Sequence, residues 1–334
     1  MELRSVAKWG RNAMLVLIAL IAAGWLAFVP AAEEPPYEFV SAWGEKGSAP
    51  GRFDDPTGIA VAGDEVFVAD SRNGRIQVFD LEGHFKRQFG TPGSSPGQLG
   101  RPMNLEIHEG RLYVAEYFND RIQVFGLDGT SQRTLGKPGN GPGEFNAPGG
   151  VAVAPNGDLL VADFYNQRVQ RLRADGTTVR QWGTTGQIGI GAGEFNYPTD
   201  AAVGPDGTLY VADGYNDRIQ AFAPDGALLR KWGGPFAINI FGPFNGWFAT
   251  VTNVTVDGQG HVFAADFYNH RIQKFAPDGT FLTSLGAKGS GRGQFNHAIA
   301  AAVADDGTVF AVDFGNNRVQ KWRQLRKASG GRPE

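Results

Sequence analysis

The strongest constraint on the fold of this chain is a motif that recurs six times. Its first copy reads Val-Ala-Asp-Ser-Arg-Asn-Gly-Arg-Ile-Gln-Val-Phe over 68–79. The other copies span 114–125, 161–172, 211–222, 264–275 and 311–322. The third residue is acidic in every copy, and it falls at Asp70, Glu116, Asp163, Asp213, Asp266 and Asp313, with separations of 46, 47, 50, 53 and 47 residues. A period of this size with strand-like content predicts the six blades of a β-propeller, an all-β fold.

Each repeat reads as four short strands joined by tight turns. In the fourth repeat we expect strands over 200–203, 209–212, 218–222 and 228–232. Asp-Gly pairs separate the first strand from the second and the third from the fourth, and this dipeptide is a strong hairpin signal. A calcium loop would need several spaced carboxylates, whereas these turns offer one or two. We therefore interpret the Asp-Gly pairs as turns.

The two ends of the chain complement each other. The last repeat ends after its third strand, at Trp322. A segment near the N-terminus, 38–48, aligns with 280–290, which forms the fourth strand and exit loop of the fifth repeat. We expect this N-terminal strand to complete the sixth blade and close the ring. Closure removes two sheet edges that would otherwise favour aggregation.

A hydrophobic segment lies ahead of the repeats. Three basic residues, Arg4, Lys8 and Arg11, precede an uncharged apolar run over 13–29, and an acidic pair follows it. This order of charges predicts that the N-terminus stays inside and the body lies outside the cytoplasm. The segment fits a signal peptide cleaved after Ala31 or an uncleaved anchor, and its 17 apolar residues favour the anchor.

The chain therefore divides into five regions. They are a basic cytoplasmic flank (1–12), a signal-anchor or signal-peptide helix (13–30), a linker (31–36), the propeller (37–323) and a polar C-terminal tail (324–334). We expect a single-pass protein of the inner membrane with the propeller in the periplasm, or a secreted periplasmic protein if the segment is cleaved. In either case the linker leads to the rim of the sixth blade.

One copy of the repeat shows an extended pattern most clearly. It reads Gly-Glu-Phe-Asn-Ala-Pro-Gly-Gly-Val-Ala-Val over 143–153, followed by Val-Ala-Asp and by Asn-Gln-Arg-Val-Gln-Arg-Leu up to Leu172. This pattern resembles the NHL repeat, and the resemblance covers about residues 37–323. It implies a bacterial, extracytoplasmic six-bladed propeller. Function stays open, because propellers of this type include RNA- and protein-binding proteins, sensor domains of receptor kinases and related lyases that amidate peptides.

Three polar positions of the motif recur, represented by Asp70, Asn73 and Arg75 in the first copy. A catalytic group is needed once, whereas a network that stabilises a blade is needed in every blade. We therefore expect Asp and Arg to pair across the turn and Asn to satisfy loop amides. The six arginines of this set are then not available to a ligand.

In a propeller, the loops between second and third strands and the loops between successive blades emerge on one face, which we call the loop face. Aromatic residues in the former loops favour recognition, although they could instead pack against neighbouring blades. The first strands add polar residues at the channel mouth. The candidate ligand-binding residues are Tyr117, Phe118, Phe164, Tyr165, Tyr215, Trp247, Phe267, Tyr268, Asn104, Asp200 and Asn253.

The connection between the fourth and fifth blades is expanded and apolar. Between Gly233 and Thr252 it carries Phe236, Ile238, Ile240, Phe241, Phe244, Trp247 and Phe248. An apolar insertion of this kind indicates a lid over the channel mouth, a docking patch or a plug of the channel.

Few residues favour catalysis. The chain has no cysteine, which excludes thiol chemistry and disulfides. Of five histidines, only His270 and His297 are expected on the loop face, whereas a catalytic zinc normally takes three protein ligands. The histidine-rich zinc site of the peptide-amidating lyases is therefore incomplete. The metal-ligand candidates for an enzyme are His270, His297, Asp200 and Glu106, which would hold zinc or calcium.

We expect a non-catalytic binding or scaffold module that needs no cofactor and engages a protein, peptide or envelope ligand through the loop face. The alternative is a calcium- or zinc-dependent lyase or lactonase-like enzyme at the channel mouth. Nucleic acid is disfavoured as a partner, because the net charge is -3 and the pI is near 6.0.

Overall fold

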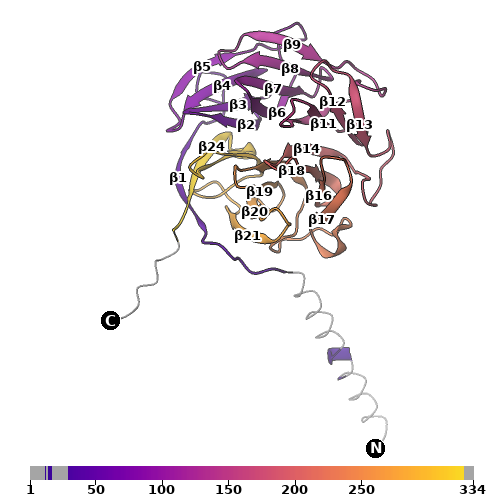
Figure 1. The fold of residues 1–334 in the computed structure, drawn as a ribbon. Helices are drawn as coiled ribbons and strands as arrows, with labels where there is room; N and C mark the ends of the chain where they lie inside the picture. The colour runs from indigo at the N-terminus through magenta and orange to yellow at the C-terminus, as the bar shows by residue number, and fades with distance from the viewer. Residues whose placement is uncertain (1–11, 13, 17–28, 327–334) are drawn as a thin grey trace, which may run out of the picture.

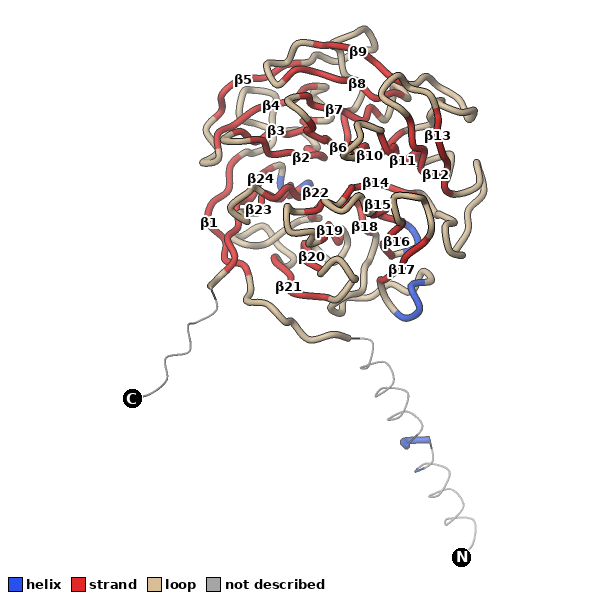
Figure 2. Tube along the Cα trace, viewed as in Figure 1, coloured by secondary structure: helices blue, strands red, loops and turns tan. Residues whose placement is uncertain are grey.

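The computed structural model describes residues 12, 14–16 and 29–326. Within these residues the chain forms six four-stranded antiparallel sheets around a central axis (Figure 1). Strands and tight turns make up the blades, and the only helical segments in the propeller body are short 3-10 turns (Figure 2). The predicted six-bladed propeller is confirmed.

The first three blades are consecutive in sequence. Blade 1 consists of β2 (Pro56–Ala62), β3 (Glu65–Asp70), β4 (Arg75–Asp80) and β5 (Phe85–Phe89). Blade 2 consists of β6 (Pro102–His108), β7 (Arg111–Glu116), β8 (Arg121–Gly126) and β9 (Ser131–Leu135). Blade 3 consists of β10 (Pro148–Val153), β11 (Leu159–Asp163), β12 (Arg168–Leu172) and β13 (Thr178–Trp182).

The remaining blades follow the same plan. Blade 4 consists of β14 (Pro198–Val203), β15 (Leu209–Asp213), β16 (Arg218–Phe222) and β17 (Leu228–Trp232). Blade 5 consists of β18 (Val251–Val256), β19 (Val262–Asp266), β20 (Arg271–Phe275) and β21 (Phe281–Leu285). Blade 6 consists of β22 (Ala298–Val303), β23 (Val309–Asp313), β24 (Arg318–Gln324) and β1 (Tyr37–Trp43). The 3-10 turns are η1 (Gly214–Asn216), η2 (Pro235–Ala237) and η3 (Phe314–Asn316).

The N-terminal strand closes the ring, as predicted. β1 pairs antiparallel with β24, from Tyr37 opposite Gln324 to Trp43 opposite Val319, and completes the sheet of β22, β23 and β24. β24 continues to Gln324, beyond the predicted end of the strand at Trp322. The extension exists because Tyr37 and Glu38 supply two further partners across the ladder.

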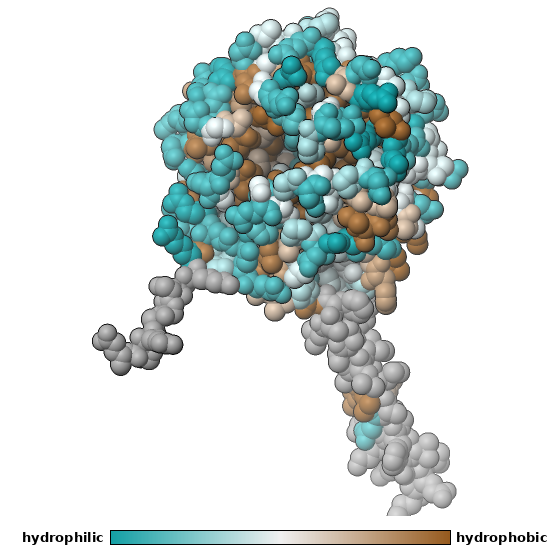
Figure 3. Space-filling view, viewed as in Figure 1, coloured by the Kyte–Doolittle hydropathy of each residue, from teal (hydrophilic) through white to brown (hydrophobic). Residues whose placement is uncertain are grey.

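The hydrophobic core lies between neighbouring blades. One cluster, for example, joins Val169 of blade 3 to Val211 and Phe222 of blade 4, with Phe195 between them. Phe195 belongs to the Gly-x-Phe motif ahead of the first strand, and its side chain is fully buried. Burial of such a ring contributes about 2–3 kcal/mol, so this residue holds one blade to the next. Where the six innermost strands meet, the disc is hollowed and apolar residues line the wall (Figure 3).

The predicted N-terminal helix over 13–30 falls outside the described residues except for 14–16, 29 and 30. No helix in the described part of the chain has the length and apolar character needed to cross a membrane. The linker is described from Pro30 onward. It runs along β21 of blade 5 before it reaches blade 6 (Figure 1).

Candidate functional site

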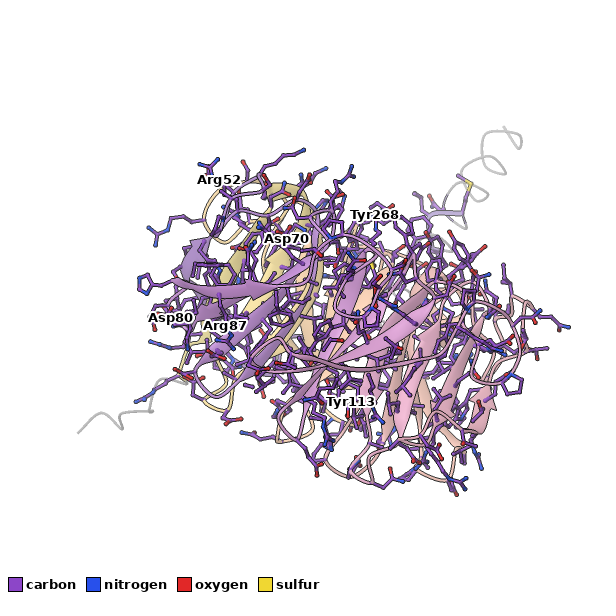
Figure 4. The ribbon with its side chains drawn as sticks, turned by 90° about the horizontal axis from the view of Figure 1, so that it is seen from above. Arg52, Asp70, Asp80, Arg87, Tyr113 and Tyr268 are labelled. Carbon is purple, nitrogen blue, oxygen red and sulfur yellow. The ribbon has the colours of Figure 1, made fainter. Side chains whose placement is uncertain are left out.

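The repeated polar residues form a network inside every blade. In blade 1, Asp70 Oδ2 accepts hydrogen bonds from Arg75 Nε at 2.7 Å and from Asn73 Nδ2 at 2.9 Å, and Asp70 Oδ1 accepts the backbone N–H of Asp54 at 2.8 Å. The equivalent acid–arginine pairs of all six blades are 2.6–2.8 Å apart. Asp70 lies on the loop face, opposite Tyr113, Asp80 and Arg87 (Figure 4). The network is structural, as expected.

The motif glutamine is a member of this network that the sequence analysis missed. Gln77 Nε2 donates to Asp70 Oδ2 at 3.0 Å and to the carbonyl of Arg52, and its Oε1 accepts the N–H of Gly51 at 2.8 Å. The same residue recurs as Gln123, Gln170, Gln220, Gln273 and Gln320, all fully buried. Its recurrence in all six copies was the signal that could have assigned it.

The loop face is hollowed at its centre by a cavity of about 400 Å³, which we call the mouth. Six of the predicted residues line it: Asn104, Tyr117, Phe164, Tyr215, Phe267 and Tyr268. They come from blades 2, 3, 4 and 5. Thr57, at the repeat position before that of Asn104, also lines it, and so do residues that the sequence analysis did not select, namely Arg101, Met103, Gly149, Thr199, Thr250, Thr252 and Ile299. These flank the first residue of a first strand, which is proline in blades 1 to 4, Val251 in blade 5 and Ala298 in blade 6, so their repeat position was the available signal.

The aromatic residues of the mouth touch one another in a chain. Ring centroids are 6.1 Å apart for Tyr117 and Phe164, 4.9 Å for Phe164 and Tyr197, and 5.1 Å for Tyr197 and Tyr215. Across the mouth, Phe267 packs at 5.0 Å from Tyr268. Tyr197, at the end of the loop between blades 3 and 4, belongs to this chain of rings without lining the mouth itself, and the sequence analysis missed it.

Some aromatic residues of the loops pack against neighbouring blades, and others are exposed and open to a ligand. Tyr117, Phe164 and Phe267 are half-buried against neighbours, whereas Tyr215 and Tyr268 keep 50% and 60% of their surface exposed. Phe118 and Tyr165 are also exposed, although neither lines the mouth. Burial raises the pKa of the Tyr117 phenol, as does its neighbour Tyr165. The hydroxyl therefore remains a hydrogen-bond donor at neutral pH.

Trp247 does not line the mouth. Only 3% of it is exposed, because its ring packs 5.0 Å from that of Phe244 and against Gly242. Trp247 and Phe248 occupy the places of Glu144 and Phe145 in the Gly-x-Phe motif. The backbone carbonyl of Trp247 accepts Arg271 and Gln273, as the equivalent carbonyls do in other blades.

A polar layer lies directly beneath the mouth. Asp200 Oδ2 accepts Asn253 Nδ2 at 2.8 Å and the backbone N–H of Val254 at 3.1 Å, and Asn253 Oδ1 accepts the N–H of Ala301 at 2.9 Å. Asn104 lies within 3.5 Å of Asn253. The predicted residues Asn104, Asp200 and Asn253 therefore meet at the axis of the propeller, but their side chains are buried and hydrogen-bonded to each other. A side chain at Gly150 would overlap Asp200, which explains the glycine there.

Two carboxyl groups share the narrow channel below this layer. Asp200 and Glu106 line one cavity together with apolar residues of the first strands. Burial raises the pKa of Glu106 to about 8, and the nearby charge of Asp200 adds to the rise. Burial also raises the pKa of Asp200 to about 8, although hydrogen bonds from Val254 and Asn253 oppose it. Both groups hold a proton more firmly than an exposed carboxyl does.

The predicted histidine pair is present on the loop face, where it joins two blades. The backbone N–H of His297 donates to His270 Nδ1 at 2.9 Å, and the His297 ring stacks on Phe267 at 4.4 Å. Gln167 and Asp217, at the repeat position of His270, accept the equivalent N–H groups of Tyr197 and Thr250. His270 is therefore one copy of a bond that fastens successive blades.

The four metal-ligand candidates fall into two separate pairs, the histidines on the loop face and the carboxyls in the channel. Within residues 29–326, no three histidine, aspartate or glutamate side chains converge as ligands of one ion. Burial lowers the pKa of His270, as does the charge of His297, so the ring is neutral and its Nδ1 accepts a hydrogen bond. That nitrogen is occupied by the backbone of the next blade.

Comparison with known proteins places the repeat in a family. The NHL repeat model matches residues 53–79, 145–172, 195–222 and 248–275. Each matched unit begins at the buried phenylalanine of the Gly-x-Phe motif and ends at the last apolar residue of the third strand. Four of the six blades of this β-propeller therefore carry NHL repeats. The remaining blades repeat the same geometry, including the acid–arginine pair.

Two curated proteins match short parts of this NHL propeller. Protein brain tumor of Drosophila melanogaster is 52% identical over 48 residues, which is 14% of this chain and 5% of that protein. B-box type zinc finger protein ncl-1 of Caenorhabditis elegans is 53% identical over 47 residues, 14% of this chain and 6% of that protein. The matches therefore span about one repeat and a small fraction of these relatives.

Solved structures share the fold across most of the chain. A Bacteroides thetaiotaomicron protein of unknown function superposes with a TM-score of 0.67 at 16% identity, covering 86% of this chain and 76% of that one. A streptogramin B lyase superposes with a TM-score of 0.59 at 17% identity, covering 86% and 97%. Virginiamycin B lyase from Staphylococcus aureus gives 0.55 at 16% identity, covering 81% and 95%. At these identities the likeness extends to the fold alone.

Proposed function

We propose that this NHL propeller is a membrane-tethered, extracytoplasmic binding module that holds a peptide or protein segment in its mouth. The observation that carries the proposal is the lining of the mouth. Aromatic rings from four blades surround a cavity of about 400 Å³, and the loops that present them stand on a rigid ring of sheets. Concave sites with aromatic walls and a few fixed polar groups are typical binding sites.

The polar groups of the mouth indicate the chemistry of the ligand. The hydroxyls of Thr57, Thr199 and Thr252 are engaged, because each donates to a backbone carbonyl of the next blade. Arg101 lines the mouth with its guanidinium 5.4 Å from the Phe118 ring, and no carboxylate of the described residues pairs with it. A carboxylate is the natural partner of a guanidinium. The ligand we propose therefore combines an aromatic or apolar side chain with a carboxylate.

The tether is supported by the sequence. The basic residues before the apolar run of 13–29 and the acidic pair after it give the order of charges that orients a segment with the body outside. The absence of cysteine suits a domain that folds without disulfides after export. In this arrangement the loop face meets ligands of the envelope rather than of the cytoplasm.

A selection of displayed peptides against the full chain in detergent micelles tests the binding role. We expect the selected peptides to carry an aromatic or apolar residue next to a carboxylate. The triple variant Tyr117→Ala, Tyr215→Ala and Tyr268→Ala should weaken their binding by roughly 100-fold, because truncating central aromatic contacts costs about 1 kcal/mol or more each. Arg101→Gln should weaken carboxylate peptides and leave their amides unchanged.

The matched control is the triple variant Phe85→Ala, Val179→Ala and Leu229→Ala, which removes exposed apolar groups from the outermost strands β5, β13 and β17. It should bind like the parent chain. Equal binding by the mouth variant and the parent would show that the mouth is not the site, and the proposal would then be wrong.

A further inference from the structure

The two longest connections between blades lie on either side of blade 4. The loop over 233–250 has 18 residues and the loop over 183–197 has 15, whereas the loops over 44–55, 90–101, 136–147 and 286–297 have 12 each. Arg218 of blade 4 holds the two long loops together, because its Nη1 donates to the carbonyl of Ile190 at 2.6 Å and to that of Ala237 at 3.0 Å.

These loops expose large apolar side chains outside the mouth. We call the set the apolar edge, and it consists of Ile188, Ile190, Phe236, Ile238, Phe241 and Phe244, which are between 36% and 71% exposed. The loop over 233–250 contains no charged residue. None of the six lines the mouth, so these side chains form neither a lid nor a plug of the channel. Large contiguous apolar surfaces on a soluble domain mark interaction sites.

The backbone of the longer loop holds these side chains outward under strain. Phe236, Ala237 and Asn239 have φ values of 60°, 49° and 62°, in the left-handed region that favours glycine. Such residues persist only where the surroundings fix them. Here Asn239 donates its backbone N–H to the carbonyl of Asn216 at 3.1 Å, and Ala237 is buried against blade 4. The conformation that exposes Phe236 and Ile238 is therefore a fixed feature of the fold.

The chain enters the propeller beside this loop. Asn245 Nδ2 donates to the carbonyl of Pro30 at 3.2 Å, and Gly246 faces the Pro30 ring, where a Cβ would come within 3.1 Å of Pro30 Cγ. The linker is then tied to blade 5. The backbone N–H groups of Glu33 and Glu34 donate to the carbonyl of Leu282 at 2.8 and 3.0 Å.

A partly buried ion pair reinforces this attachment. The Glu34 carboxylate accepts Lys274 Nζ at 2.6 Å and Gln324 Nε2 at 2.7 Å. Burial alone would raise the pKa of Glu34, but the two hydrogen bonds hold it below its ordinary value. The linker is therefore fixed to the propeller. The apolar run of 13–29 ends directly before Pro30, and Pro30 is hydrogen-bonded to the loop that carries Phe244.

We propose that the apolar edge inserts into the headgroup region of the bilayer that receives the N-terminal apolar run. A lipid surface is the occupant that fits, because the run of 13–29 ends at Pro30 against the same loop and the edge has aromatic and aliphatic groups without charge. The contact orients the disc with blade 4 toward the membrane. This proposal rests on the membrane tether of the proposed function.

Single cysteines report the contact, since the chain has none of its own. The full chain is reconstituted in vesicles of phosphatidylethanolamine and phosphatidylglycerol and labelled with an environment-sensitive fluorophore at Phe241→Cys. The matched control is Phe118→Cys, which replaces an equally exposed phenylalanine on blade 2 of the same face. Brominated lipids should remove about half or more of the emission at 241, because interfacial side chains lie 5–10 Å deep. Emission at 118 should be unaffected.

The outcomes separate the two proposals. Extraction of the chain by alkaline carbonate would mean that the tether is absent, and the membrane placement in the proposed function would fall together with the lipid contact, whereas peptide binding in the mouth is tested separately. A retained chain whose label at 241 stays in water would overturn the lipid contact alone. A label at 241 that is shielded but not quenched by brominated lipid would show a protein occupant, either a second copy or the segment 13–29, and would overturn it as well. Equal quenching at 118 would mean that the whole loop face lies on the bilayer, against the edge-on contact.

Discussion

Arg218 and Asp213 form an ion pair that is fully buried between β15 and β16. Burial raises the pKa of Asp213, and the charge of Arg218 acts against that rise, so the carboxylate depends on its partner. Arg218 in turn binds four backbone carbonyls of the loops on either side of blade 4. The pair therefore holds both the blade and the loops that carry the apolar edge.

Asp213→Asn removes the counter-charge of a buried guanidinium. We expect the free energy of unfolding to fall by about 3–5 kcal/mol, as is usual when one partner of a buried pair is lost. Arg52→Ala breaks the pair with Glu45, in which both side chains are at least half exposed, and should cost less than ~1 kcal/mol. Urea unfolding followed by circular dichroism measures both. Equal losses for the two variants would contradict the role given to the network.

The channel carboxyls predict a pH dependence of stability. The folded pKa of Asp200, about 8, lies above its ordinary value of 3.8. Between these values the folded protein holds a proton that the unfolded chain has released, so this contribution to stability is complete below about pH 4 and is lost as the pH rises through 8. Asp200→Asn should therefore gain stability relative to the parent between about pH 5 and pH 9. If the urea concentrations at the midpoint of unfolding changed with pH in the same way for the two proteins, the raised pKa of Asp200 would be contradicted.

The residues that recur were predictable, and those that act across blades were not. Asp70, Asn73 and Arg75 could be assigned because the same three groups stand at the same spacing in each copy. His270 was considered a metal ligand, whereas its role depends on the N–H of His297 in the next blade. Trp247 was counted as part of an insertion because local hydrophobicity does not reveal its alignment with Glu144. The repeat position of Arg101, next to Pro102, indicates that it lies near the mouth, but the lack of a carboxylate partner for its guanidinium among the described residues is visible only in the structure.

At the scale of elements, β1 joins the two ends of the chain through Trp43. Its ring lies 5.9 Å from Phe79 of blade 1 and 5.9 Å from Phe310 of blade 6. The closing strand was predictable because 38–48 repeats the pattern of 280–290. The course of the linker along β21 was not predictable, because it depends on the bond between Glu34 and Lys274, which are far apart in the sequence.

Trp43→Ala tests the closure of the ring. We expect a loss of about 3 kcal/mol in the free energy of unfolding, because a large ring is removed between two blades. Leu229→Ala, a truncation of an exposed residue on the outermost strand of blade 4, should cost less than ~1 kcal/mol. Hydrogen exchange should rise first in β1 and β24 while β10 to β13 stay protected. Uniform exchange in all blades would contradict a closing role for β1.

In the molecule as a whole, three different parts of the propeller have three different roles. The buried networks hold the blades, the mouth presents aromatic rings and Arg101 at the centre of the loop face, and the linker fixes the exit of the chain beside the apolar edge. The six-fold repetition explains why the fold is visible in the sequence. The mouth is assembled from positions where the copies differ, so the identity of its ligand is not visible in the sequence.

Crosslinking in cells tests whether the mouth binds a peptide or protein segment. A photoreactive phenylalanine analogue is placed at Tyr215, in the mouth, or at Phe85, on the outermost strand of blade 1. We expect a defined peptide or protein adduct from position 215 and none from position 85. No adduct from position 215, or the same adducts from both positions, would overturn the binding role of the mouth.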